Sequence, residues 1–365
     1  MRIAIIADPI YKQSAGIYTF TVNFINSLLS IDQKNEYHIF GLEKDHFNNA
    51  FYHHVPNTIP FLKNDPVRTF YQLPLQIKKI NPDVVVEPAH FGPFNLPGKI
   101  KRVTIIHDLT PVRYPQYHKF FSQMLQRVFL PGILKRADLI ITNSQNTMQD
   151  VIEYSPGSGN KTHFIHLGKE EIFKPDQNPN VLTKYGLKKP YLLYVGTIEP
   201  RKNLSFLLKA YELFRAGNPG SVDLVIIGRK GWKSKNFYKV LAQNKYKKDI
   251  KLPGYVLRND LPAIFTGALA FVFPSLYEGF GLPVLEAMSC GTPCLVSNIG
   301  SLKEVIGGSG MTFHPDDSAK LVNQLTQIYQ DRKVRDKLSK DSLRRAAFFS
   351  WDKFAKTFIN LIGSL

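Results

Sequence analysis

The stretch that most constrains the fold of this chain runs from Phe273 to Gly300 and reads FPSLYEGFGLPVLEAMSCGTPCLVSNIG. The apolar run over 269–273 predicts a buried strand, and the proline that follows ends it. A loop with two glycines comes next. Pro283 then suits the first position of a helix, where its missing N–H costs no hydrogen bond. A strand that passes through a glycine-rich loop into a helix is the repeating unit of α/β domains with parallel sheets.

Two carboxylates lie on either side of this turn, Glu278 in the loop and Glu286 in the first helical turn. Backbone N–H groups at the start of such a helix can point at an anion, and the helix dipole adds to the attraction. An ordinary strand–turn–helix unit is the simpler interpretation of the glycine pair. The spacing of the two glutamates around the turn favours a functional site, and before other residues are considered it also fits an acid–base pair.

The size and composition of the chain fit a globular protein with two domains. Its 365 residues exceed what one core usually organises, and 44% of them are hydrophobic against 21% charged. No segment approaches the roughly 18–20 consecutive apolar residues that a membrane span needs. The opening MRIAIIADPIYKQ predicts a buried strand and not a signal peptide, so Cys290 and Cys294 are expected to be a reduced pair.

The net charge of +18 is concentrated in the second half of the chain. Up to Pro175 there are 19 basic and 14 acidic residues, and after it 28 and 15, so the excess is +5 and then +13. The densest basic run extends from Arg229 to Lys251. Such a charge can serve nucleic acid, an anionic lipid surface or a phosphorylated substrate, and a solvated basic face is the alternative.

Strand-like and helix-like segments alternate along the whole sequence. The predicted strands are 2–7, 37–40, 84–86, 103–106 and 138–142 in the first half, and 191–195, 223–227, 250–252, 270–273 and 294–297 in the second. The segment 168–190 lacks an apolar period and is predicted to be a linker. The chain therefore predicts two α/β units in series, each with a parallel, doubly wound sheet whose ligands bind at the carboxyl ends of the strands.

Charged and polar residues follow several predicted strands. Arg201 and Lys202 come shortly after Gly196 at the end of one strand, where adjacent cations suit a diphosphate or are simply exposed loop charges. His107 directly follows another strand, where it can donate to a substrate hydroxyl or make a structural hydrogen bond. Gly16 ends the first loop and allows backbone to approach a phosphate. The sequence has no Asp-x-Asp for a divalent metal, which favours catalysis by fixed cations and backbone dipoles.

Three motifs together resemble a known family. Glu278-Gly-Phe-Gly-Leu-Pro-Val-Leu-Glu286 resembles the E-x7-E motif of family 4 of the retaining, nucleotide-sugar-dependent glycosyltransferases. Gly196-Thr-Ile-Glu-Pro-Arg-Lys-Asn is similar to the phosphate-binding loop of that family, and His107-Asp-Leu-Thr-Pro with Tyr114-Pro is similar to its bacterial mannosyltransferases. The resemblance covers essentially the whole chain.

The resemblance implies the GT-B fold, in which two Rossmann-like domains face each other across a cleft. The N-terminal domain, on the acceptor side, would comprise residues 1–175, and the nucleotide-sugar-binding domain residues 176–347. The C-terminal helix of this fold crosses back to the N-terminal domain. We expect this crossover at about 348–365, where the aromatic stretch Phe348 to Phe358 lies.

The resemblance also implies roles for individual residues. Arg201 and Lys202 would neutralise the leaving diphosphate, and Gly16 would approach it from the other domain. Glu286 would hold the ribose hydroxyls, as carboxylates do in dinucleotide sites. Gly196 would belong to the phosphate-binding loop, and Tyr255 and Val256 would lie near the base. The sugar hydroxyls would be bound by Glu278 and by the backbone of Phe280, Gly281 and Leu282. His107 would contact the sugar from the N-terminal domain. One departure from the family is Ala15, where relatives often carry a second glycine, and it leaves the approach of the acceptor open.

The function implied is transfer of a hexose, with mannose from GDP-mannose favoured, to a lipid-linked or polysaccharide acceptor. Retention usually indicates two carboxylates and a double displacement. This family is instead associated with front-face attack, in which Glu278 positions the sugar and no metal or other cofactor is required. A sugar-nucleotide epimerase or a phosphorylase would keep the fold, but the acid–base pair or cofactor lysine that they need is not identified. A nucleic-acid binder that uses the run from Arg229 to Lys251 is a remote alternative, because that run has few interleaved aromatic residues, and no nucleic-acid partner is expected.

The expected location is the cytoplasm, with attachment to the inner face of the cell membrane as a further possibility. The net positive charge and an aromatic-rich predicted helix over 117–130 fit an anionic membrane surface. That helix has the alternative of being part of the core.

Overall fold

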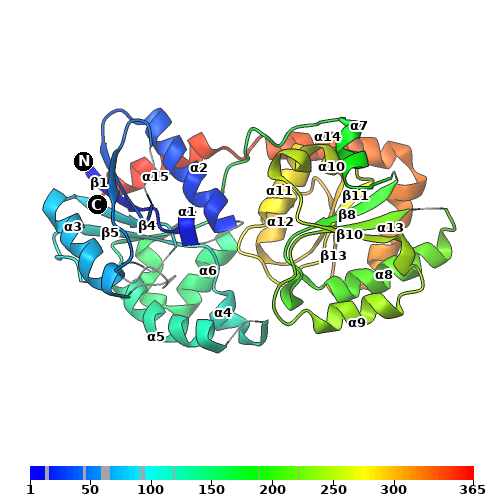
Figure 1. The fold of residues 1–365 in the computed structure, drawn as a ribbon, viewed down its shortest axis with the longest axis horizontal. Helices are drawn as coiled ribbons and strands as arrows, with labels where there is room; N and C mark the ends of the chain where they lie inside the picture. Colours follow the sequence, from blue (N-terminus) through cyan, green and yellow to red (C-terminus); the bar gives the residue numbers. More distant parts are fainter. Residues whose placement is uncertain are drawn as a thin grey trace. The chain divides into compact units, whose positions relative to one another are not determined.

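The computed structural model describes residues 1–12, 16–43, 47–58, 66–89, 92, 95–117, 120–188, 190–220 and 222–365. The chain forms two compact units, one made of Met1–Gly168 with Ser350–Leu365 and the other of Lys169–Phe349 (Figure 1). The sequence placed these divisions at 175/176 and 347/348.

The first unit is built on a parallel sheet. Among the described residues it has seven strands in the order β3-β2-β1-β4-β5-β6-β7. They are β1 (Arg2–Ile6), β2 (Glu36–Gly41), β3 (Phe51–His54), β4 (Val84–Glu87), β5 (Lys101–Ile106), β6 (Leu139–Thr142) and β7 (Thr162–Phe164). β4 and β6 are buried along their whole length, which explains their mostly apolar sequences VVVE and LIIT, since a parallel sheet is covered on both faces.

Helices connect the strands of this sheet. They are α1 (Pro9–Lys12), α2 (Gly16–Ile31), α3 (Leu73–Ile80), α4 (Thr110–Arg113), α5 (Phe120–Arg136) and α6 (Gln145–Tyr154). A π-helical turn, Arg68–Gln72, precedes α3, and 3₁₀ turns lie at Pro115–Tyr117 and Pro156–Lys161. These connections between parallel neighbours give the doubly wound arrangement that the alternating sequence pattern predicts.

The second unit repeats this plan around a smaller parallel sheet. In the part of the chain that the structure describes, its six strands follow the order β10-β9-β8-β11-β12-β13. The strands are β8 (Tyr191–Val195), β9 (Asp223–Ile227), β10 (Ile250–Gly254), β11 (Ala270–Phe273), β12 (Cys294–Ser297) and β13 (Met311–Phe313). The helices are α7 (Pro179–Lys184), α8 (Leu204–Gly217), α9 (Lys235–Gln243), α10 (Leu261–Gly267), α11 (Leu282–Ser289), α12 (Gly300–Ile306), α13 (Ser318–Gln330) and α14 (Arg332–Ala346). Short 3₁₀ turns occupy Pro200–Lys202, Lys247–Asp249 and Arg258–Asp260. The prediction of two Rossmann-like domains is confirmed.

The segment predicted as a linker between the domains, 168–190, is attached to the second unit in its described part from Lys169 on. Phe173 is buried and packs edge-on against Phe265 with a ring-centroid distance of 6.1 Å. The backbone N–H of Asp176 donates to the hydroxyl of Thr266 at 3.0 Å, and α7 contacts α10. The lack of an apolar period was misleading because one buried aromatic ring and a few polar contacts are enough to attach a short segment.

The last helix, α15 (Trp351–Ile362), belongs to the first unit and packs against α2 (Figure 1). Its buried residues Trp351, Phe354 and Phe358 form one stripe at helical spacing. The ring of Phe354 lies 5.6 Å from that of Phe20, and the ring of Phe358 lies 4.9 Å from that of Phe24, both edge to face. The predicted return of the C-terminal helix to the N-terminal domain is therefore confirmed, and aromatic packing holds it there.

This packing predicts that Phe358→Ala lowers the stability of the first unit by about 3–5 kcal/mol, because it empties a fully buried aromatic site. Phe348→Ala is the matched control, since Phe348 is 61% exposed and should change stability little. Urea unfolding followed by circular dichroism measures both. Equal stabilities of the two variants would contradict the role given to α15.

Candidate functional site

The candidate site of the second unit lies where two neighbouring strands end. β8 and β11 are adjacent and parallel, so the loops that follow them leave the sheet at the same edge. The backbone N–H of Leu276, after β11, donates to the carbonyl of Arg201, after β8, at 2.8 Å. Sheet topology therefore brings together two motifs that are far apart in the sequence.

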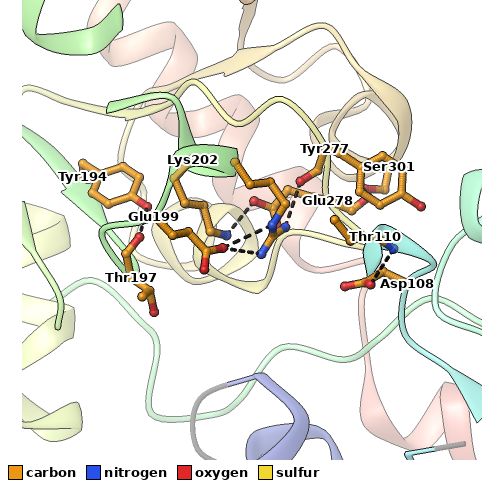
Figure 2. A network of polar contacts seen from close by, with 10 residues as sticks. Asp108, Thr110, Tyr194, Thr197, Glu199, Lys202, Tyr277, Glu278 and Ser301 are labelled. Atoms are coloured by element: carbon orange, nitrogen blue, oxygen red, sulfur yellow. Dashed lines mark hydrogen bonds and ion pairs between the residues drawn. The ribbon is translucent and has the colours of Figure 1, made fainter. Parts of the chain in front are cut away.

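Glu278 is clamped between two cations, as Figure 2 shows for its contact with Lys202. Lys202 Nζ lies 2.6 Å from Glu278 Oε1, and Arg201 Nη1 lies 2.9 Å from Glu278 Oε2. Arg201 also donates to the carbonyl of Tyr277 at 2.8 Å and, through Nη2, to Glu199 Oε1 at 2.8 Å. Two carboxylates and two cations thus form one buried network.

Burial and charge compete for the protonation states of this network. Burial acts to raise the pKa of Glu278, but Arg201 and Lys202 outweigh it and hold that pKa at about 2. Burial, with the positive charge of Arg201, lowers the pKa of Lys202, and the two carboxylates oppose that shift. Burial also raises the pKa of Glu199, which Arg201 only partly offsets. Glu278 is therefore an ionised carboxylate across the physiological range.

Aromatic rings and the next helix support the network from the apolar side. The Lys202 ammonium lies 5.0 Å from the centroid of the Phe273 ring, and Tyr194 stacks on that ring at 5.8 Å. On the other side of the turn, the hydroxyl of Ser301, in α12, donates to the backbone carbonyl of Glu278 at 2.7 Å (Figure 2). The backbone and the side chain of Glu278 are therefore each held by their own partners.

The turn into α11 requires a glycine. Gly281 has a φ of 106°, and a Cβ at this position would lie 2.6 Å from Leu302 Cδ2. The helix begins at Leu282, so Pro283 is its second residue and not its first as predicted. Either position leaves the missing N–H without consequence, because the first four N–H groups of a helix have no partner within it. Phe280, just before the turn, is buried with its ring edge-on to Phe349 at 5.8 Å.

Glu286, within α11, has a partner that the sequence did not suggest. Arg258 Nη2 lies 3.0 Å from Glu286 Oε1 and also pairs with Glu170, at the start of the second unit. The Arg258 guanidinium lies 5.0 Å from the centroid of the Phe173 ring. Burial raises the pKa of Glu286 to about 7, even though Arg258 acts in the opposite direction. The two glutamates of the turn thus have opposite pKa shifts, so they do not share one role.

The residues expected near a nucleotide base differ in exposure. Tyr255 follows β10 and is 60% exposed, and the Arg229 guanidinium lies 4.8 Å from its ring centroid. The side chain of Val256 is buried. Of the two, only Tyr255 presents a side-chain surface on which a ring could stack.

His107 and Gly16 belong to the first unit. The His107 Nε2 lies 2.7 Å from the carbonyl oxygen of Pro88, so this nitrogen carries the proton and donates it. Burial lowers the pKa of the ring, and Nδ1 of the neutral imidazole is an acceptor. His107 therefore makes the structural hydrogen bond that the sequence left as an alternative, and it can accept from a hydroxyl at Nδ1 instead of donating to one. Gly16 is the first residue of α2.

The sequence interpretation omitted Glu199, Arg258 and Glu170 from the site. Glu199 could have been inferred, because a buried arginine and lysine need more negative charge than one carboxylate supplies. Arg258 and Glu170 are 88 residues apart, and the sequence around each predicts an ordinary exposed charge. Only the fold shows that their side chains meet. Within the ranges that the structure describes, no cluster of three or more His, Cys, Asp or Glu side chains is arranged to bind a metal ion. Among the same residues, no helix combines the length and the apolar character needed to cross a bilayer.

Solved structures share this fold over the whole length of the chain. The sucrose-phosphate synthase of Thermosynechococcus elongatus matches with a TM-score of 0.81 at 19% identity, over 100% of this chain and 98% of that one. Anabaena HepE, solved in complex with UDP-glucose, matches with a TM-score of 0.79 at 16% identity over the full length of both chains. The fold is that of the GT-B class of glycosyltransferases.

Sequence comparisons narrow this class to one family. Residues 16–169 match the family model described as Glycosyltransferase Family 4, and residues 179–345 match that described as Glycosyl transferases group 1. The O-antigen chain mannosyltransferase B of Escherichia coli is 34% identical over 277 residues, which cover 74% of this chain and 73% of the relative. The serotype-specific mannosyltransferase WbdA of Escherichia coli is 32% identical over 69% of this chain, but this alignment covers only 32% of WbdA. The chain belongs to glycosyltransferase family 4, which confirms the resemblance seen in the three motifs.

Proposed function

We propose that this glycosyltransferase moves mannose from GDP-mannose to a lipid-linked or polysaccharide acceptor, with retention of configuration and without a metal ion. The observation that carries the proposal is the clamp of Arg201 and Lys202 on Glu278 at the carboxyl ends of β8 and β11. The choice of mannose is supported by the names of the relatives, which are mannosyltransferases of O-antigen chains.

Arg201 and Lys202 would stabilise the leaving diphosphate. Both are held in place by carboxylates, so little reorganisation is needed when negative charge develops on the departing nucleotide. Fixed cations of this kind supply the charge neutralisation that a divalent metal provides in other transferases, which is why we propose a metal-independent reaction.

Glu278 would position the sugar and contribute its negative charge to the electrostatic potential at the site. With a pKa of about 2 it has no proton to give, so it does not act as a general acid. Both of its oxygens are engaged by cations, which makes it a poor nucleophile. These properties support front-face attack, in which the donor's own phosphate helps to deprotonate the acceptor and no covalent glycosyl-enzyme forms.

Glu286 would hold the ribose diol and His107 would contact the sugar. An ionised Glu286 can accept hydrogen bonds from both ribose hydroxyls, and Arg258 orients it. In the tautomer set by Pro88, Nδ1 of His107 would accept a hydrogen bond from a donor hydroxyl. Tyr255 would stack on the base.

The donor is tested by incubating the protein with GDP-mannose, UDP-glucose, UDP-galactose and GDP-fucose, with a mannose oligosaccharide as acceptor and an excess of EDTA. We expect mannosyl transfer from GDP-mannose in the presence of the chelator, and product with the same anomeric configuration as the donor by NMR. Transfer from a UDP-sugar instead, or loss of activity in EDTA, would overturn the corresponding part of the proposal.

The role of Glu278 predicts a separation of turnover from donor binding. Glu278→Gln should reduce kcat by about 10²–10³-fold, the typical effect of losing a preorganised electrostatic group. Donor affinity should be retained or improved, because the change leaves Arg201 and Lys202 less neutralised. Steady-state kinetics and GDP titrations measure the two effects, with exposed Glu171→Gln as the control. An unchanged kcat would remove Glu278 from the reaction.

The pKa of Glu286 predicts a pH dependence of nucleotide binding. Its pKa is raised to about 7, so the side chain is mostly protonated below that pH and mostly ionised above it. If the ionised form binds the ribose diol, GDP affinity should rise with pH up to about pH 7 and then level off, with up to a tenfold loss per unit well below the midpoint. Calorimetric titration of GDP at several pH values measures this, and Glu286→Gln should flatten the profile. A Gln variant that keeps the wild-type profile would assign the titration to another group.

Attachment to an anionic membrane is proposed through α5. Among its described side chains, Met124, Val128 and Phe129 are exposed apolar groups, and Arg127, Lys135 and Arg136 are exposed basic ones. The side chains of Phe120, Phe121 and Leu125, also expected on this helix, lie outside what the structure describes. Co-sedimentation should be stronger with vesicles that contain phosphatidylglycerol than with neutral vesicles, and Val128→Glu should weaken it. Equal binding to both kinds of vesicle would contradict the proposal.

A further inference from the structure

A cavity of about 440 Å³ lies in the first unit, outside the residues assigned above. One wall is a face of α2 that includes Tyr18, Asn26 and Ser30, and another is the segment 47–49 after β2. From Tyr18 to Ser30 the helix rises about 18 Å at 1.5 Å per residue, so the cavity follows an elongated path along α2. Its volume lies within the range typical of small-molecule sites.

The described residues that line this cavity suit an uncharged ligand rich in hydroxyl groups. None of them is charged, although the chain as a whole has a net charge of +18. Asn26, Asn48 and Asn49 provide amides, each of which both donates and accepts hydrogen bonds. Tyr18, which is 42% exposed, and Phe47 add aromatic rings. Neutral amides beside aromatic rings match the alternating hydroxyl and C–H surfaces of a sugar, and they supply no charge to pair with a phosphate or a metal ion.

The Phe47 ring is held in place before any ligand arrives. It stacks on Tyr52 with a centroid distance of 6.2 Å and an interplanar angle of 28°. The hydroxyl of Tyr52 shares a hydrogen bond with that of Tyr11 at 3.0 Å. A Cβ at Gly41 would lie 1.9 Å from the Tyr52 hydroxyl oxygen, so only glycine leaves room for this stack. An aromatic surface that is fixed in this way loses little entropy on binding.

The position of the cavity relates it to the transfer reaction. α2 begins at Gly16, two residues before Tyr18, and Gly16 is the residue expected to approach the donor diphosphate. The end of the cavity at Tyr18 therefore lies two residues from the position proposed for that contact, and the cavity extends from there along the helix. An acceptor saccharide whose end is extended near Gly16 has room for its other sugars in the cavity along α2.

We infer that this cavity is a saccharide subsite, which binds the sugars of the acceptor chain behind the one that is extended. The inference rests on the proposed function for the identity of the acceptor. It adds a binding site between α2 and the segment 47–49 and predicts that the protein prefers longer acceptors, because each additional sugar that reaches the amides gains hydrogen bonds.

The test compares acceptors of different length in matched variants of one helix. The measured quantity is the ratio of kcat/KM for a linear mannotetraose to kcat/KM for methyl mannoside. Asn26→Ala and Phe47→Ala should lower this ratio by about three- to tenfold, the effect of losing one or two hydrogen bonds or a stacking contact. Asn23→Ala is the control, because Asn23 lies on α2 outside the cavity and bonds to the carbonyl of Thr19. A ratio that is the same in the Asn26 and Asn23 variants would overturn the inference.

Direct binding separates this inference from the proposed function. Mannotetraose is titrated calorimetrically into the full-length protein without a nucleotide sugar. Binding that is lost in Asn26→Ala but kept in Asn23→Ala supports the subsite even if no mannosyl transfer from GDP-mannose is seen, in which case the proposed function alone fails. The opposite result is mannosyl transfer without selective binding, in which the variants all bind mannotetraose equally or none of them binds it. That result supports the proposed function and removes the subsite.

Discussion

The ion pairs that Glu278 makes with Arg201 and Lys202 are the interaction on which the second unit's site depends. Removing three charged groups from water costs several kcal/mol for each ion, and only close pairing and hydrogen bonds offset that cost. The same contacts tie the loop after β8 to the loop after β11, so neither loop can move without separating buried charges. The network is also balanced, with Glu199 and Glu278 facing two cations. Two positive side chains can therefore stay close together and ready for an anion without repelling each other.

The fold was largely predictable because its central strands contain short runs of buried apolar residues. β1, β4 and β6 have one polar residue each, at an end of the strand, and β5 ends in the buried sequence VTII. Three strands at the sheet edges were missed, namely β3 (Phe51–His54), β7 (Thr162–Phe164) and β13 (Met311–Phe313). They are short, and β3 and β7 carry polar, partly exposed side chains, so their pairing comes from the neighbouring strand and not from their own pattern.

The site was predictable to the extent that sheet topology determines which loops meet. Parallel neighbours bring Arg201, Lys202 and Glu278 to one edge, and the sequence motifs identified all three. The pKa shifts of the two glutamates were not predictable, because they depend on partners selected by packing. Arg258 pairs with both Glu286 and Glu170 and lies over the Phe173 ring, so these contacts join α11 to the segment that carries Glu170 and Phe173. The hydrogen bond of His107 to Pro88 likewise depends on how a loop folds beside β5.

The place of α15 in the first unit has a consequence for how the protein is made. The aromatic rings of Phe20 and Phe24 lack their contacts with α15 until Phe354 and Phe358 have been synthesised, after the whole of Lys169–Phe349. The second unit is therefore an insertion within the first, and the face of α2 that α15 covers stays uncovered by it while the second unit is synthesised. The aromatic contacts that close the first unit are thus the last to form, although they join its second helix to the end of the chain.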